Sequence, residues 1–81
     1  MTGKECAVIM YLYQQDFTTP VKSVSLKKLD INIKKVSINT IRKALKKAML
    51  EGYVSEGIKE AQSKTYYLTK KGYNWIDEIA E

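Results

Sequence analysis

The sequence predicts a mainly α-helical domain with a small β-hairpin, an α+β fold. Through most of the chain, apolar residues recur at three- and four-residue steps, which is the period of amphipathic helices. After Gly52 this period stops, and two short segments rich in aromatic and branched residues follow. The 81 residues are 44% hydrophobic and 28% charged, which is typical of one globular domain over residues 1–81.

The first helix is expected over residues 4–17. Its apolar face consists of Cys6, Ile9, Met10, Tyr13 and Phe17, widened by Val8 and Leu12. Such a wide face predicts contact with a second helix or a second subunit. Pro20 disfavours helical geometry in the residue before it, so the helix is expected to end near residue 18. Residues 21–24 are then suited to a short edge strand.

Two short helices joined by a tight polar turn are expected over residues 25–52. Ser25 caps the first, which runs from residue 26 to about residue 33, and Lys34, Lys35 and Val36 form the turn. Ser37 caps the second helix, and Gly52 suits the left-handed position that closes it. The apolar stripe of this helix consists of Ile38, Ile41, Leu45, Ala48 and Met49. This arrangement is typical of a helix-turn-helix.

A β-hairpin is expected over about residues 53–68. Its strands lie within residues 53–59 and 64–68, and residues 60–63 join them. Thr69 then caps a last helix over about residues 69–80, with Tyr73, Ile76 and Ile79 on one side. Gly72, in the first turns of this helix, allows another segment to approach closely. A helix-turn-helix followed by a two-stranded wing is the winged-helix architecture.

The chain also resembles a known group of proteins over roughly residues 24–80. The runs IRKALKKAMLEGYV and YYLTKKGYNWI are similar to the winged-helix DNA-binding domains of the MarR and PadR transcription regulators. Leu68, Thr69 and Gly72 match the Leu-Thr-x-x-Gly signature of those families. The chain departs from them at Ala48, where such helices usually carry leucine. It also lacks the wing-tip arginine that MarR-type proteins commonly place in the minor groove.

The net charge of +5 is concentrated in the helix-turn-helix. Residues 21–47 contain nine of the 14 lysines and arginines and a single acid, Asp30. Such a basic block is expected of a polyanion contact. In the helix that follows Ser37, the face opposite the apolar stripe carries Asn39, Thr40, Lys43 and Lys47, flanked by Arg42 and Lys46. Short polar groups followed by cations suit base edges and phosphates respectively, although a solvated lysine-rich face gives the same pattern.

The predicted DNA contacts fall into three groups. The base contacts are Asn39, Thr40 and Lys43, since Asn pairs bidentately with adenine and Lys can reach guanine. The phosphate contacts are Lys34, Lys35, Ser37, Lys46 and Lys47, with Ser37 also expected to act as a cap. The wing contacts are Lys59, Gln62, Ser63 and Lys64. Leu50 points partly outward and is expected to touch the wing or a partner.

Other chemistries find little support in the residues. The chain has no histidine, one cysteine that is expected to be buried, and no glycine-rich phosphate loop, so we predict no catalytic residues, no metal and no cofactor. No apolar run reaches the roughly 18 residues of a membrane span, and no signal peptide is visible, so a cytoplasmic protein without membrane contact is expected.

The sequence therefore predicts sequence-specific binding of double-stranded DNA by a small winged-helix protein. A transcriptional regulator is the main interpretation, expected to act as a homodimer through its first and last helices, because pairing doubles the binding site. A plasmid or phage replication or partition factor would use the same surface. A winged-helix module for protein–protein interaction is the alternative outside DNA binding.

Overall fold

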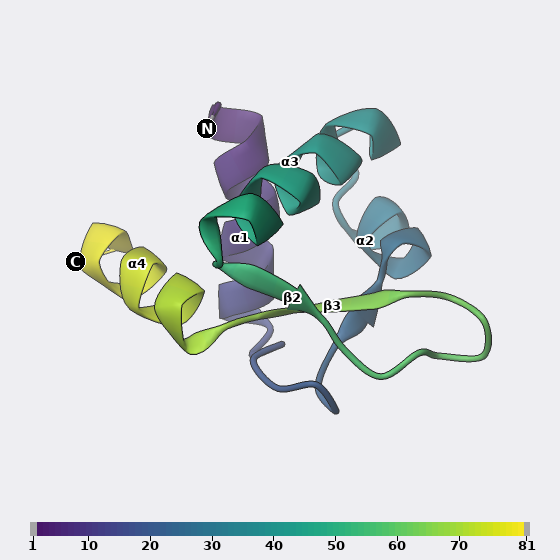
Figure 1. The fold of residues 1–81 in the computed structure, drawn as a ribbon. Helices are drawn as coiled ribbons and strands as arrows, with labels where there is room; N and C mark the ends of the chain where they lie inside the picture. Colours follow the sequence, from purple (N-terminus) through teal and green to yellow (C-terminus); the bar gives the residue numbers. More distant parts are fainter. Residues whose placement is uncertain (1, 81) are drawn as a thin grey trace.

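The computed structural model describes residues 2–80. Its elements follow the predicted order (Figure 1): α1 Gly3–Gln14, β1 Val24–Ser25, α2 Leu26–Asn32, α3 Ile38–Glu51, β2 Val54–Glu56, β3 Thr65–Leu68 and α4 Lys70–Ala80. Helices α2 and α3 form the helix-turn-helix, and β2 and β3 form the wing. The predicted winged-helix fold is confirmed.

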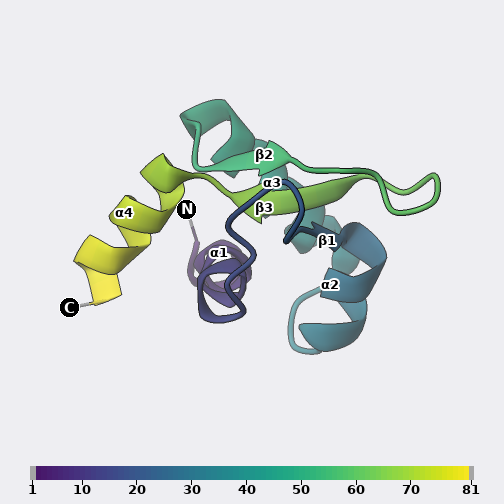
Figure 2. The same ribbon diagram turned by 90° about the horizontal axis from the view of Figure 1, so that it is seen from below.

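The three strands form one antiparallel sheet in the order β1-β3-β2 (Figure 2). Strand β3 is central: Val24 of β1 pairs with Tyr66, and Val54 of β2 pairs with Leu68. The edge strand predicted over residues 21–24 begins only at Val24. Its expected start is a turn instead, because the Lys22 amide donates to the Thr19 hydroxyl at 2.9 Å.

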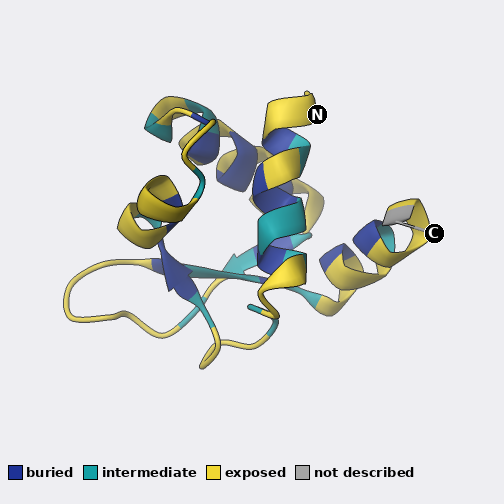
Figure 3. Cartoon of the chain, turned by 180° about the vertical axis from the view of Figure 1, so that it is seen from behind, coloured by how far each residue is buried: buried dark blue, intermediate teal, exposed yellow. Residues whose placement is uncertain are grey.

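The core lies between α1, α3 and the sheet (Figure 3). Its largest fully buried apolar side chains are Ile9, Leu12, Leu29, Ile41, Leu68, Ile76 and Val8. The buried side of α3 is Ile41, Ala44, Leu45 and Ala48. Met49 was wrongly placed on this stripe: it is 39% exposed, because the helix turns Ala44 towards the core in its place.

Helix α1 is shorter than predicted, and the centre of its buried face is shifted from the predicted one. It ends at Gln14 because Asp16 adopts a left-handed conformation, with φ of 60°, and the Phe17 amide donates to the Leu12 carbonyl at 3.0 Å. Its buried residues are Glu5, Val8, Ile9 and Leu12. Cys6, predicted to be buried, is half-exposed at the margin of this face.

One buried charge joins α1 to α3. Glu5 completes a capping box with Thr2, accepting a bond from the Thr2 amide at 2.8 Å. Lys47 of α3 places its Nζ 3.0 Å from the other Glu5 oxygen. The Thr2 amide and then Lys47 lower the pKa of Glu5 to about 2, so the carboxylate is ionised at neutral pH. Lys47 is thereby held against the body of the protein.

The Leu-Thr-x-x-Gly signature forms the junction of α3, the wing and α4. The Thr69 hydroxyl donates to the Gly52 carbonyl at 2.6 Å and accepts from the Gly72 amide at 3.1 Å. A β-carbon on Gly72 would overlap the Tyr53 carbonyl and would lie 2.7 Å from Leu68 Cδ1. The close approach predicted at Gly72 is confirmed, and the backbone of residue 53 is the segment that approaches.

We predict that Gly72→Ala lowers the free energy of unfolding by about 2–3 kcal/mol, because the added methyl meets backbone that cannot move without shifting α4. Urea unfolding followed by circular dichroism measures the loss. Gly3→Ala is the matched control: a β-carbon there has no neighbour within 4 Å. Equal stability of the Gly72→Ala variant and the wild type would contradict the packing argument.

Candidate nucleic-acid interface

The exposed side of α3 carries a line of residues that the buried stripe leaves facing outward. Asn39, Lys43, Lys46 and Leu50 occupy positions one turn apart and are all exposed. No acidic residue occurs between residues 38 and 50. The first three are polar or cationic, whereas Leu50 is apolar and 81% exposed. The cationic part of this line therefore ends at Lys46, before the last turn of the helix.

At the N-terminal end of α3, some side chains that were predicted to contact DNA are exposed, and others already form hydrogen bonds within the protein. Ser37 is the N-cap, as predicted, and accepts a bond from the Thr40 amide at 3.3 Å. The Thr40 hydroxyl is 3.0 Å from that of Ser37, so it is already bonded and half-buried. Asn39 is exposed, and Lys34 and Lys35 are exposed in the turn that leads into the helix.

Lys46 and Lys47 were both predicted to contact phosphates, but they differ in their ion pairs within the protein. Lys46 is exposed, and no ion pair to it occurs within residues 2–80. Lys47 is bound by Glu5, whose side chain is 4% exposed. The ion pair with Glu5 neutralises Lys47, so Lys47 offers less charge to an outside anion than Lys46 does. The partners are 42 residues apart, which no local pattern could reveal.

The predicted wing contacts lie around a tight tip. Glu60 and Ser63 exchange backbone hydrogen bonds of 3.1 and 3.0 Å, which leaves Ala61 and Gln62 as the turn. Lys59, Gln62, Ser63 and Lys64 are all exposed. Lys64 pairs with Glu56 at 3.4 Å, and Lys28 of α2 pairs with Glu60 at 3.0 Å. Both acids of the wing are thus neutralised, and Lys28 was not among the predicted site residues.

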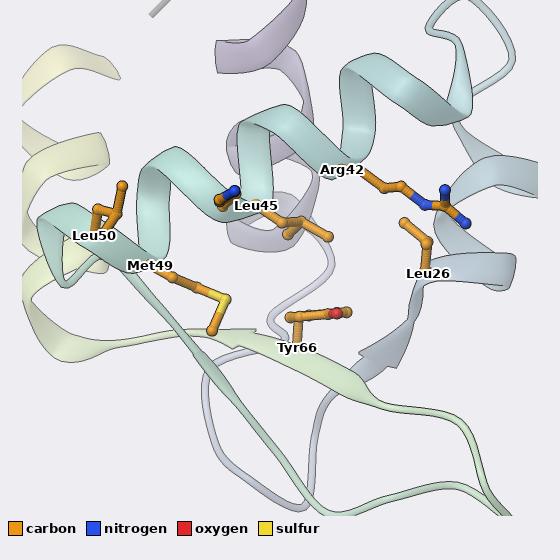
Figure 4. Close-up of a pocket in the computed structure, with 7 residues that line it drawn as sticks. Leu26, Arg42, Leu45, Met49, Leu50 and Tyr66 are labelled. Carbon is orange, nitrogen blue, oxygen red and sulfur yellow. The ribbon is translucent and has the colours of Figure 1, made fainter.

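A hollow of about 440 Å³ separates the middle of α3 from the wing (Figure 4). Leu26, Leu45, Met49 and Tyr66 supply most of its lining, and Arg42 extends from α3 over Leu26. Arg42 lay only at the flank of the predicted face and was not among the predicted contacts. The hollow is assembled from α2, α3 and β3, so no single segment of the chain could indicate it.

Within residues 2–80, no helix has the length and apolar character that crossing a membrane requires. The same residues contain no group of three or more His, Cys, Asp or Glu side chains placed to hold a metal ion.

This chain is similar to known proteins in sequence and in structure. No protein-family model matches the chain. The chain is 37% identical over 75 residues to the DNA-binding protein TubR of Clostridium botulinum C phage, covering 93% of this chain and 91% of that protein. The solution structure of the DNA-binding TubR fragment from Clostridium botulinum matches with a TM-score of 0.79 and 35% identity, covering 98% of this chain and 96% of the other.

More distant structures share the fold. TubR from Bacillus megaterium pBM400 matches with a TM-score of 0.85 at 16% identity, over all of this chain and 88% of that one. Lactococcus lactis ZitR matches with a TM-score of 0.75 at 21% identity, over 99% of this chain and 51% of that one. The expected likeness to MarR and PadR regulators therefore holds for the winged-helix fold. In sequence, the relative reported above is TubR. This chain belongs to the family of TubR DNA-binding proteins.

Proposed function

We propose that this protein binds double-stranded DNA through the first three turns of α3, the turn before the helix and the wing. The observation that carries the proposal is the exposed line of Asn39, Lys43 and Lys46, with no acidic residue beside it on the helix. Lys34 and Lys35 extend this basic surface into the turn. Membership in a family whose relatives are named as DNA-binding proteins supports the same conclusion.

Within α3, the proposed contacts are weighted towards the first two turns. Asn39 and Lys43 are the candidates for base edges, because both side chains are exposed and unengaged in the described part of the chain. Thr40 is a weaker candidate, since its hydroxyl already bonds Ser37. The last turn presents Met49 and Leu50 to solvent. Apolar groups gain little against phosphates, so this turn should lie outside the DNA groove.

For the biological role, we favour a plasmid or phage partition factor over a general transcription regulator. The family relationship is the support: the relative with 37% identity is TubR of a phage. Partition and repression would use the same DNA surface, so the geometry of α3 is compatible with both. A module that binds only proteins is less favoured, because the relatives at 35–37% identity are named as DNA-binding proteins.

We also propose a homodimer through α1 and α4. Within one protomer these helices already meet, since the Tyr13 hydroxyl donates to Asp77 at 3.0 Å and this bond raises the pKa of Tyr13 to about 12. Tyr73 and Ile79 of α4 remain 38% and 57% exposed. A second copy could cover this apolar edge and double the DNA-binding site.

Replacing single lysines by alanine tests the DNA surface. We expect Lys43→Ala to weaken duplex binding about tenfold at roughly 0.1 M salt and to reduce the salt slope by about 0.9, because one phosphate or base contact is lost. Lys47→Ala should cost less affinity, since Glu5 holds this lysine. Lys70→Ala, which removes the same charge from exposed α4, is the control. Fluorescence anisotropy across a salt series measures all four proteins, and equal binding by wild type and Lys43→Ala would reject α3 as the reader.

Plasmid retention tests the partition role. The gene and its flanking DNA, placed on an unstable plasmid together with the other genes of its locus, should raise retention over generations without selection. Lys43→Ala should reduce that retention, because the DNA contact is required for it. Unchanged retention alongside altered transcription from the locus would instead favour a regulator.

Sedimentation equilibrium tests the dimer. We expect the wild type to sediment as a dimer and Ile79→Glu to shift it towards monomer, because the charge would be buried at the interface. Leu50→Glu, an equally drastic change at another exposed apolar side chain, is the matched variant. Dissociation by Leu50→Glu alone would move the interface to α3 and contradict the proposed one.

A further inference from the structure

Arg42 differs in chemistry from every other basic residue of the chain. Of the 14 lysines and arginines, it is the single arginine. It lies on α3 beside Lys43, but its side chain extends towards α2, over Leu26 (Figure 4). Arginine is planar, donates in a fixed fork and is less strongly hydrated than lysine, so the two are not equivalent at an anion site.

Arg42 stands where two hollows meet. The first runs along α3 over Leu45 and Met49, and the second, of about 400 Å³, leads towards Ser63 and Lys64 of the wing. Both are lined by Leu26, Arg42 and Tyr66. Together they form a trough between α3 and the wing, with an apolar floor and Arg42 at its centre.

The guanidinium of Arg42 carries a charge that the fold does not neutralise. Within residues 2–80, no carboxylate forms an ion pair with it. Asp30 lines the second hollow, but it too makes no ion pair with Arg42. Lys64, which lines the second hollow, is already paired with Glu56. Lys46 lines the first hollow and Lys27 the second, whereas Arg42 lines both. Among the cations without an ion pair in the described part of the chain, Arg42 is therefore the one placed where the two hollows join.

We propose that Arg42 clamps one phosphate of a DNA strand that crosses this trough. The inference rests on the proposed function and adds the path of the strand. If α3 enters a major groove and the wing reaches the adjacent minor groove, the sugar–phosphate strand between the grooves must pass between helix and wing. The apolar floor suits the deoxyribose, and the guanidinium fork suits two oxygens of one phosphate.

The surroundings explain why this position holds arginine. Leu26 and Tyr66 line both hollows together with Arg42, and a guanidinium is less strongly hydrated than an ammonium beside such apolar groups. A bidentate contact also fixes the orientation of the strand, which a lysine, acting as a point charge, does not. A lysine at this position, which supplies the charge without the fork, should therefore not give wild-type binding.

Three variants at this position separate charge from geometry. We expect Arg42→Ala to weaken duplex binding about tenfold or more and to reduce the salt slope by about 0.9, because a phosphate contact is lost. Arg42→Lys should keep the salt slope but still weaken binding about fivefold, because the charge remains and the fork is lost. Arg42→Gln, which keeps the length of the side chain, should resemble Arg42→Ala and preserves the test if the alanine variant unfolds.

The measurements are fluorescence anisotropy with a random-sequence duplex over about 0.05–0.3 M salt, and thermal melting by circular dichroism. Lys70→Ala is again the control. Wild-type affinity in both Arg42→Ala and Arg42→Gln overturns the assignment of a phosphate contact, and wild-type affinity in Arg42→Lys overturns the bidentate clamp. If Lys43→Ala weakens binding while Arg42→Ala does not, this inference fails and the proposed function stands. If the wild type binds no duplex at low salt, the proposed function itself fails.

Discussion

The junction at Gly52 and Tyr53 fixes the relation between helix α3 and the wing. Gly52 closes α3 with φ of 81°, and the Tyr53 amide donates back to Ala48 at 2.8 Å. The Thr69 hydroxyl and amide then bind the carbonyls of Gly52 and Tyr53, and the absence of a side chain at Gly72 lets α4 start directly against this turn. Because β2 leaves the junction and β3 returns to it, the wing has one direction relative to α3.

A second constraint decides which cations remain available. The described acids Glu5, Glu56 and Glu60 each hold a lysine. These pairs lie at the borders of the proposed DNA surface: at α1, on the wing strand and at the wing tip. Exposed pairs such as Lys28–Glu60 add little to stability. Their larger effect is on the local field, because each one cancels a negative charge that would repel a phosphate, and each also withholds a lysine from the DNA.

Local signals in the sequence predicted much of the fold. Ser25, Ser37 and Gly52 are caps in the structure because capping depends on a few neighbouring residues. The errors have non-local causes. Met49 was assigned to the core because its spacing fits the stripe, but in the packed structure Ala44 is buried and Met49 is exposed. Lys47 was assigned to phosphate because its partner Glu5 is distant in sequence. The trough at Arg42 needs three elements in contact, so no single segment could predict it.

The two halves of α3 indicate how affinity and specificity would be divided. Cations at the turn, on the first turns of α3 and in the trough would supply most of the binding free energy, which depends on salt and ignores sequence. Few exposed groups are suited to base edges, Asn39 and Lys43 foremost. One protomer would therefore read a short sequence, and useful discrimination would require several protomers on neighbouring sites. The exposed apolar residues Tyr73 and Ile79 on α4 are consistent with that requirement, since they offer a place where a neighbouring protomer could add contacts that DNA does not.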